Sequence, residues 1–396
     1  MQKIIFIAER EFPNGNAGGI RVLHLAKMFQ VLGFSVHVYA LTRSRSTSDT
    51  EIIRGVYEGV PYDLCVIPSG LKGVFIRYFS ACWILGKAFR KNKQQNGDDA
   101  ATAIIYSTNV FFVLSSYLNF SSLKAIWFDV VERFETENFR AWFVNPKFYF
   151  FQILYKKLYG RSRGVIAISE EIKGDFSEKT RVVKIPCLYN IKDLTFSETK
   201  VRRPGEKLKL IYSGNPRWKE RVDVMLGALL ELPPDLRNKL ELHFTGASIH
   251  DVASTLGADR WMLEALSDVI IWHDWMDYSD LIQLYSHMDF LYFIRDDKPA
   301  TRANFPMKLP ELMAHGIIPI TTRVGDHGLM LQDRRNSFVV SEPSATAAAG
   351  VLKDILQLDR SKLDMMRVSA RYSVETALDA KEFADRNPLL KEIFTS

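Results

Sequence analysis

The sequence predicts an α/β protein built from two Rossmann-like domains. Short apolar runs rich in β-branched residues alternate with stretches of helical periodicity, a pattern typical of a parallel sheet covered by helices. This alternation stops at a polar stretch that contains Pro204 and Gly205, and then it starts again. The length of 396 residues suits about two ordinary domains.

A βαβ unit is predicted at the start of the chain. Residues 3–8 form a short apolar run typical of a buried parallel strand, and residues 20–32 have a helical apolar period that ends at Gly33. The loop between them is rich in turn residues and includes Gly18 and Gly19. Further strands of the first domain are expected at residues 35–40, 64–67, 103–106, 124–128 and 164–168.

The second domain is expected to follow residues 193–206, which are polar and are interpreted as a linker. Residues 352–394 at the end of the chain are predicted to be mostly helical. Strands of this domain are expected at residues 208–212, 240–244, 269–272, 290–293 and 317–321.

Composition excludes several classes of protein. The three cysteines are far apart and form no CxxC pair, and the eight histidines have no HExxH spacing. A disulfide scaffold, a zinc ribbon and a zinc hydrolase are therefore not expected, and a reducing cytoplasm is. The first residues do not have the pattern of a signal peptide, and no run of about 18 apolar residues predicts a membrane span.

The motif at residues 304–323 carries a resemblance to a known family. It includes Pro306, Lys308, Glu311, Gly316 and Pro319 in the order P-x-K-x-x-E…G-x-x-P, and a predicted strand follows. Together with the Gly-Gly loop and the two Rossmann-like halves, it resembles the GT-B glycosyltransferases. Among these it is most similar to the retaining class called family 4, or group 1.

The resemblance implies two domains that face each other across a cleft. Residues 1–200 would bind the acceptor and residues 207–372 the nucleotide-sugar donor, while a C-terminal helix at 373–396 packs back on the first domain. The implied reaction transfers a sugar to a glycan with retention. It needs no metal and no cofactor, because the nucleotide sugar is a co-substrate.

Donor-binding candidates follow from the negative charge of a diphosphate leaving group, which requires cations nearby. The loop 214–221 supplies Arg217, Lys219 and Arg221, of which at least one is expected to bind phosphate. Lys308 is expected beside them. The resemblance assigns Glu311 to the ribose hydroxyls, and Gly18 and Gly19 would let the backbone approach the donor phosphate or the acceptor.

The sequence departs from the family pattern at the first glutamate of its E-x7-E motif. Ala303 stands at that position, so the usual contact with the donor sugar is missing. Arg295 and the three residues after it either take over this contact or form a polar turn.

Candidates in the first domain come from the end of a strand and from the first helix. Asp129 and Glu132 follow the predicted strand 124–128, at the edge where open α/β sheets bind ligands, and are the catalytic candidates. Asp129 could equally cap a helix. Arg21 and His24 are acceptor-binding candidates, with a solvated arginine and a packed histidine as the alternatives.

The net charge of +6 is concentrated in two stretches without acidic residues, 64–96 and 141–163, which also hold many aromatic residues. Such segments suit the headgroup region of an anionic membrane. They favour a lipid-linked acceptor in bacterial surface polysaccharide synthesis, with the enzyme at the inner face of the membrane.

Two other functions remain open from the sequence. One is a nucleotide-sugar epimerase of the GT-B type, and the other is a degenerate transferase that acts only as a binding partner. Nucleic acid is not an expected partner, because no recognition motif accompanies the basic residues. The sequence does not indicate the nucleotide, the sugar, the acceptor or the oligomeric state.

We expect the protein to bind vesicles that contain anionic lipid and to leave neutral vesicles, because each cation near such a surface contributes about 1 kcal/mol. Replacing Lys87, Arg90, Lys91 and Lys93 by glutamine should reduce binding in a vesicle sedimentation assay and leave nucleotide binding unchanged. Wild-type protein that ignores anionic vesicles at low salt would refute the membrane interpretation.

Overall fold

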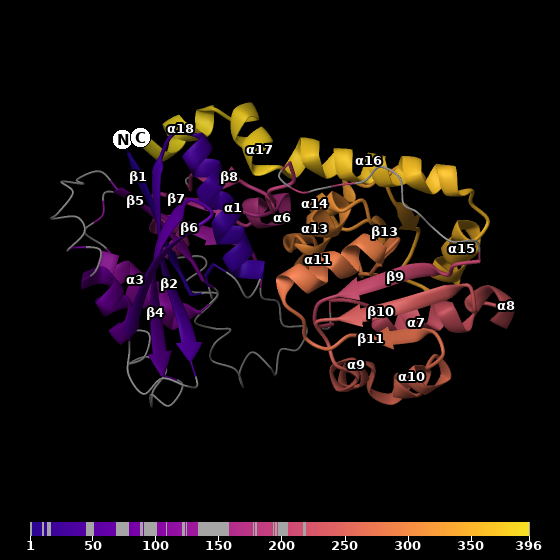
Figure 1. Cartoon of the computed structure of the whole chain (residues 1–396). Coiled ribbons are helices and arrows are strands. Elements are labelled where there is room, and N and C mark those ends of the chain that lie inside the picture. The colour runs from indigo at the N-terminus through magenta and orange to yellow at the C-terminus, as the bar shows by residue number, and fades with distance from the viewer. Residues whose placement is uncertain are drawn as a thin grey trace. The chain divides into compact units, whose positions relative to one another are not determined.

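A computed structural model gives the fold (Figure 1). It describes residues 2–9, 12–13, 17–44, 51–68, 79–87, 90, 101–107, 109–120, 123, 125–133, 158–176, 178, 180–192, 194, 196, 205–216 and 219–395. The chain divides into two compact units: Met1–Asn190 with Ala380–Ser396, and Ile191–Asp379. The second unit thus begins two residues before the expected linker 193–206. The chain returns to the first unit at Ala380, whereas residue 373 was expected.

The first unit contains an eight-stranded sheet in the order β3-β4-β2-β1-β5-β6-β7-β8. All neighbouring strands are parallel except β3 and β4. The strands are β1 (Lys3–Ala8), β2 (Ser35–Ser44), β3 (Glu51–Tyr57), β4 (Val60–Pro68), β5 (Ala101–Tyr106), β6 (Ala125–Val130), β7 (Gly164–Ala167) and β8 (Val182–Lys184). Its helices are α1 (Ala17–Val31), α3 (Val110–Phe120), η2 (Tyr159–Arg161), α6 (Glu170–Gly174), α17 (Ala380–Arg386) and α18 (Leu389–Thr395).

The second unit contains a six-stranded parallel sheet in the order β11-β10-β9-β12-β13-β14. The strands are β9 (Leu208–Ser213), β10 (Leu240–Thr245), β11 (Ile270–Trp272), β12 (Phe290–Tyr292), β13 (Ile318–Thr322) and β14 (Phe338–Val340). Its helices are α7 (Val222–Leu230), α8 (Pro234–Arg237), α9 (Ile249–Leu256), η3 (Gly257–Arg260), α10 (Trp261–Ala265), α11 (Tyr278–His287), α12 (Pro299–Ala303), α13 (Lys308–Ala314), α14 (Gly325–Gly328), α15 (Ala345–Ile355) and α16 (Arg360–Leu378).

The α/β class with two Rossmann-like sheets is therefore confirmed, and every strand expected from the sequence is present within a few residues. The sequence analysis did not predict β3, β8 or β14. The turn between β3 and β4 has positive φ at both Glu58 and Gly59, as a two-residue hairpin turn requires. Glutamate is unusual there, and it forms an ion pair with Lys27 of α1.

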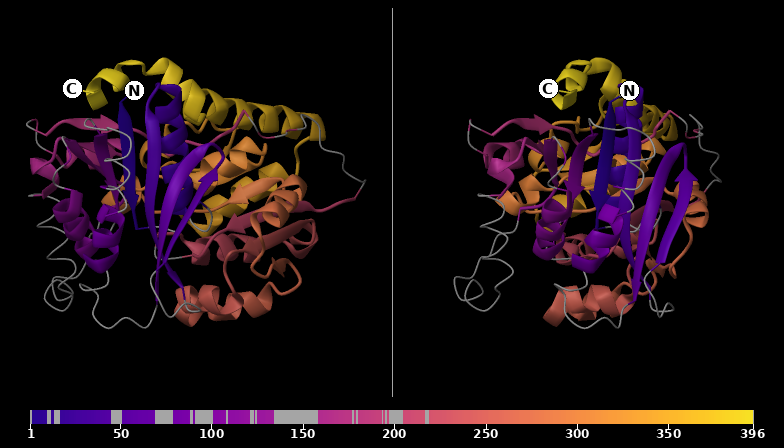
Figure 2. Two further views of the ribbon diagram at one scale, coloured as in Figure 1. Left: turned by 60° about the vertical axis from the view of Figure 1, so that its left-hand side comes forward. Right: turned by 90° about the vertical axis from the view of Figure 1, so that its left-hand side faces the viewer.

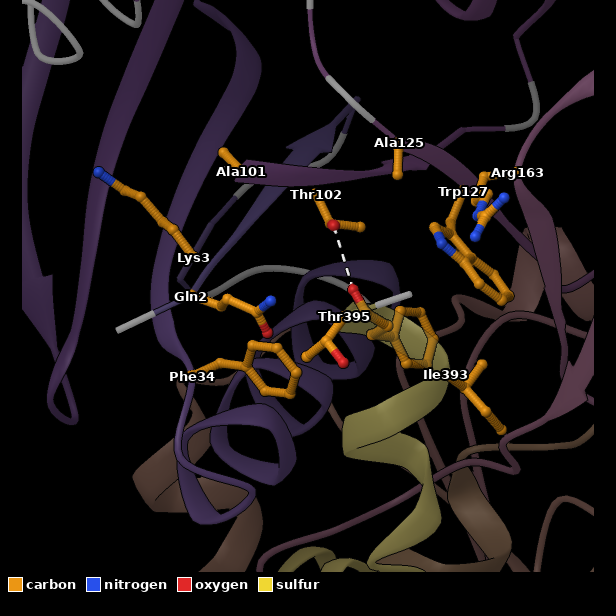
Figure 3. Close-up of a pocket in the computed structure, with 11 residues that line it drawn as sticks. Gln2, Lys3, Phe34, Ala101, Thr102, Ala125, Trp127, Arg163, Ile393 and Thr395 are labelled. Atoms are coloured by element: carbon orange, nitrogen blue, oxygen red, sulfur yellow. Dashed lines mark hydrogen bonds between the residues drawn. The ribbon is translucent and has the colours of Figure 1, made fainter. Parts of the chain in front are cut away.

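The end of the chain completes the core of the first unit. The Phe394 ring packs against Phe29 of α1 at 4.8 Å and Trp127 of β6 at 4.4 Å between ring centroids. The backbone carbonyl of Phe394 accepts a hydrogen bond from Thr102 Oγ1 at 3.2 Å (Figure 3). Both views of Figure 2 show α18 beside the start of β1, and residues of both line a small cavity of about 120 Å³.

This cavity lies at the amino ends of β1, β5 and β6, because Lys3, Thr102 and Ala125 line it. Ligands of open α/β sheets bind at the opposite, carboxyl edge, so the functional site is sought there. No helix within the described ranges is both long and apolar enough to cross a membrane.

Replacing Phe394 by alanine should lower the free energy of unfolding by about 3–5 kcal/mol, because it leaves a cavity between two buried rings. Leu389→Ala is the matched control in the same helix, since Leu389 is 66% exposed and should cost less than about 0.5 kcal/mol. Urea unfolding measures both, and equal midpoints for the two variants would contradict this role of Phe394.

Candidate functional site

Each sheet has one point where the strand order reverses, and such points form ligand crevices at the carboxyl ends of parallel strands. In the first unit the chain runs outwards from β1 to β2 and later returns to β5 on the other side of β1. In the second unit the corresponding pair is β9 and β12. The residues that follow β9 and β12 carry the most unusual cluster of charges in the described part of the chain.

Lys308 is the first residue of α13, and its ammonium is enclosed in this crevice. The side chain is 15% exposed, and Nζ lies 4.1 Å from the ring centroid of Tyr212, the penultimate residue of β9. Glu220 Oε1 is 3.9 Å from Nζ, which is an ion-pair distance but too long for a hydrogen bond. Burial lowers the pKa of Lys308 to about 8, although Glu220 opposes the shift. The ammonium is therefore still charged at neutral pH.

Arg295 lies on the other side of Glu220. Its Nη2 donates to Glu220 Oε1 at 2.6 Å, and the exposed fractions of the two side chains are only 4% and 8%. Nη1 donates to Asn304 Oδ1 at 3.1 Å. The Arg295 guanidinium is therefore buried against side chains from two other loops, and both interpretations of residues 295–298 stay predictions.

Of the two residues that follow Arg295, Asp296 is half-buried and Asp297 is exposed. Asp296 accepts a hydrogen bond from Arg221, and Asp297 forms an ion pair with Arg302. Within residues 295–298, Arg295 is therefore the one residue that is fully buried.

Several buried polar atoms around Arg295 make no hydrogen bond within the described residues: Arg295 Nε, Tyr212 Oη and both ring nitrogens of His327. His327 is fully buried between Phe293 and Phe305, and burial lowers its pKa to about 3, with a smaller effect from Arg295. Its imidazole is therefore neutral. Unsatisfied groups of this kind are rare in folded proteins and are typical of functional sites.

Glycines bring the backbone close together beside Lys308. Gly214 follows β9 with φ +109°, and a Cβ atom there would lie 3.9 Å from Lys308 Nζ. A Cβ on Gly246 would come within 3.2 Å of Gly214 Cα, where only glycine is accommodated without a shift. The loops after β9 and β10 therefore pack closely, and the Gly214 N–H donates to the Thr245 carbonyl at 2.8 Å.

The other predicted donor residues have different surroundings. Arg217 lies outside the described residues. Lys219 is half-buried in the turn before α7. Arg221 donates two bonds from Nε and Nη2 to Asp223, the shortest 2.7 Å, and one from Nη1 to Asp296 at 2.9 Å, so its guanidinium is already occupied by carboxylates.

Glu311 lies in the first turn of α13 and is half-buried. Its charge acts on the hydroxyl of Tyr285, which is 2.9 Å from Ser213 Oγ at the end of β9. Glu311 and Lys308 thus both lie by the carboxyl end of β9. The structure brings them together as the motif predicts, while their roles remain predictions.

In the first unit, the buried pair Arg21 and Asp129 forms a two-bond contact. Nε and Nη2 of Arg21 donate to the two oxygens of Asp129 at 2.8 and 2.7 Å. The remaining bonds go to the backbone carbonyls of Pro186 and Ile185, at 2.8 and 3.1 Å. Burial alone would lower the pKa of Arg21, but Asp129 raises it above its ordinary value. The geometry favours a structural crosslink over the acceptor-binding and catalytic roles expected for these residues.

The remaining first-unit candidates surround this pair. His24 is buried and packs against Tyr189 with ring centroids 4.8 Å apart, which fits the packed-histidine alternative. Gly18 and Gly19 are buried in the first turn of α1, which begins at Ala17 and not at Ile20 as expected. Glu132 is half-buried after β6.

Sequence reasoning missed Glu220, His327 and a pair at the reversal point of the first sheet. There, Ser107 Oγ donates to Glu9 Oε2 at 2.7 Å, just past β5 and β1. The sequence analysis did not single out Glu9, although its position after the first strand of a βαβ unit is a usable signal. Across the described positions, no group of three or more His, Cys, Asp or Glu side chains is arranged to hold a metal ion.

Asp129→Asn should lower the free energy of unfolding by about 3–5 kcal/mol, because it leaves the Arg21 guanidinium buried without a counter-charge. Glu171→Gln removes the partly exposed partner of Arg133 and should cost less than about 1 kcal/mol. Urea unfolding of both variants tests this. An Asp129→Asn protein as stable as the wild type would show that the pair is not a structural crosslink.

Comparison with known proteins agrees with this arrangement. Residues 195–372, which lie in the second unit, match the sequence model of the family described as glycosyl transferases group 1. No curated protein sequence is similar enough to count as a relative.

Solved structures resemble the chain over its whole length. The sucrose-phosphate synthase of Thermosynechococcus elongatus is 16% identical, with a TM-score of 0.71 over 100% of this chain and 99% of that one. An E. coli structure described as trehalose-6-phosphate bound with UDP-2-fluoro glucose is 10% identical, with a TM-score of 0.69 over 100% and 99%. Anabaena HepE in complex with UDP and glucose is 12% identical, with a TM-score of 0.66 over 98% and 99%.

At these identities the likeness establishes the fold, and the family match adds the class of the second unit. The chain therefore has the GT-B fold, and residues 195–372 of its second unit resemble the group 1 glycosyltransferases.

Proposed function

We propose that the protein transfers a sugar from a nucleoside diphosphate sugar, and that Lys308 binds the diphosphate. The observation that carries this proposal is the buried Lys308 ammonium, whose contacts are a carboxylate oxygen at 3.9 Å and the face of Tyr212. Neither is a hydrogen-bond partner, so among the described residues nothing occupies the N–H donors of the ammonium, which can bind a ligand. A buried cation with free donors suits a phosphate oxygen.

The chemistry of glycosyl transfer explains why such a cation is useful. When the bond between the sugar and the diphosphate breaks, negative charge develops on the leaving phosphate. A preorganised ammonium in a buried crevice stabilises this charge more than it would in water. With a pKa near 8, Lys308 also carries its charge at neutral pH.

Known ligands of similar structures support a UDP-linked donor. Anabaena HepE is described in complex with UDP and glucose, and the pneumococcal O-GlcNAc transferase GtfA in complex with UDP and GlcNAc. The resemblance further assigns the ribose to Glu311, and it implies retention of configuration without a metal ion. These finer features belong to the proposal.

The acceptor is proposed to bind the first unit and to be lipid-linked, as in surface polysaccharide synthesis. Most of the two basic stretches lies outside the described residues. One helical segment, residues 79–87, is described, and it exposes Phe79 and Trp83 while it buries Ala81, Cys82 and Leu85. Lys87 Nζ lies 3.6 Å from the Trp83 ring centroid. An exposed face of aromatic and cationic side chains suits an anionic membrane surface.

Lys308→Gln should weaken the binding of UDP by about 1.5–3 kcal/mol, the range for a hydrogen bond to a charged group. Isothermal titration calorimetry at pH 7 measures the change, with Lys362→Gln on the exposed face of α16 as the control. GDP and ADP are titrated into both proteins as well. If UDP is the nucleotide that binds, and it binds the Lys308 variant as tightly as the wild type, the diphosphate role is refuted.

A further inference from the structure

Three buried charges meet at the carboxyl edge of the second unit: Glu220, Arg295 and Lys308. A single oxygen, Glu220 Oε1, lies 2.6 Å from Arg295 Nη2 and 3.9 Å from Lys308 Nζ. Two buried cations therefore share one carboxylate. Burying charges costs free energy that close ion pairs offset only in part. The difference between the 2.6 Å and 3.9 Å distances therefore requires an explanation.

Arg295 is held so tightly that it acts as a fixed support. Its backbone N–H donates to Thr322 Oγ1 at 3.1 Å, and the Thr322 hydroxyl donates back to the Arg295 carbonyl at 2.7 Å. Nη1 is bound to Asn304 at 3.1 Å. The backbone of Arg295 is therefore anchored to the end of β13, and its guanidinium is bound to the loop before α13 and fixes the Glu220 carboxylate in turn.

Lys308 is held differently, because none of its contacts with described residues uses an N–H donor. Glu220 Oε1 attracts the ammonium from 3.9 Å, and the ring centroid of Tyr212 in β9 lies 4.1 Å from Nζ. The Phe293 ring, at 5.7 Å, adds a second apolar wall. Glu220 thus supplies charge to Lys308 without occupying its hydrogen bonds.

We propose that Glu220, fixed by Arg295, is a positioning residue that keeps Lys308 protonated and free to bind the donor diphosphate. This inference rests on the proposed function. If Glu220 were bound directly to Lys308, it would occupy one of the three N–H donors of the ammonium. If Glu220 were absent, the buried amine would lose its proton more readily and its attraction for phosphate would fall.

The charged and titratable groups around Lys308 come from four segments. Glu220 precedes α7 and raises the pKa of the amine, while Arg295 follows β12 and lowers it. Tyr212 of β9 contributes a neutral ring, because burial raises the pKa of its phenol far above neutrality. His327 of α14 lies near Arg295 and is neutral, so it adds no charge. Glu220 is therefore the anionic member of this set.

The test is the affinity of UDP between pH 7 and 9, measured by calorimetry on the full-length protein. The terminal phosphate of UDP is largely ionised over this range, so a change in affinity reports the protein. With a Lys308 pKa of about 8, wild-type affinity should fall about tenfold from pH 7 to pH 9. In Glu220→Gln the fall should begin at lower pH, so that more affinity is lost at pH 8 than in the wild type.

Two further variants make the result decisive. In Lys308→Arg the guanidinium stays charged, so the alkaline fall should disappear whether or not Glu220→Gln folds. Asp354→Asn breaks a surface ion pair with Arg334, 2.5 Å long, and should keep the wild-type profile. Thermal unfolding confirms that each variant is folded.

The outcomes separate this inference from the proposed function. An identical pH profile for Glu220→Gln and the wild type, or a remaining alkaline fall in Lys308→Arg, overturns the role of Glu220 and leaves nucleotide binding intact. A wild-type protein that binds no nucleoside diphosphate at any pH overturns the proposed function itself.

Discussion

The second unit depends on how it accommodates a buried carboxylate between two buried cations. Removing Glu220, Arg295 and Lys308 from water costs several kcal/mol for each ion before any attraction is counted. The 2.6 Å contact between Glu220 and Arg295 offsets part of this cost and links the loops after β9 and β12. The attraction of Glu220 offsets less of the desolvation cost of Lys308. Burial therefore lowers the pKa of Lys308.

The two units solve the same problem in opposite ways. In the first unit, Arg21 and Asp129 are buried at the carboxyl end of β6, and every described bond of the guanidinium goes to the protein. These bonds to described residues use four of the five N–H donors of the guanidinium. In the second unit, the cations outnumber the anion, and Lys308 keeps unused donors. A surplus of positive charge with free donors distinguishes a site for an anion from a structural crosslink.

Two glycines and two aromatic rings shape the surroundings of the Lys308 ammonium. Gly214 and Gly246 bring two loops to within contact distance beside the ammonium. Tyr212 and Phe293 exclude water and lower the local dielectric, so that the charge acts strongly on whatever binds there. His327, which lies near Arg295, is also fully buried and neutral.

The sequence by itself determined the α/β class, the two sheets and the closeness of Lys308 to Glu311. These features depend on local periodicity and on a motif within one loop and one helix, so nearby residues encode them. Only the tertiary structure decided which charges meet. Arg221 and Arg295 look alike in sequence, yet one is paired with surface carboxylates and the other is buried against Glu220. Arg21 and Asp129 are 108 positions apart and their contact has no local signature. Long-range pairing and burial depend on how the strands are ordered in the sheet, and these two factors separate a ligand-binding cation from a structural one.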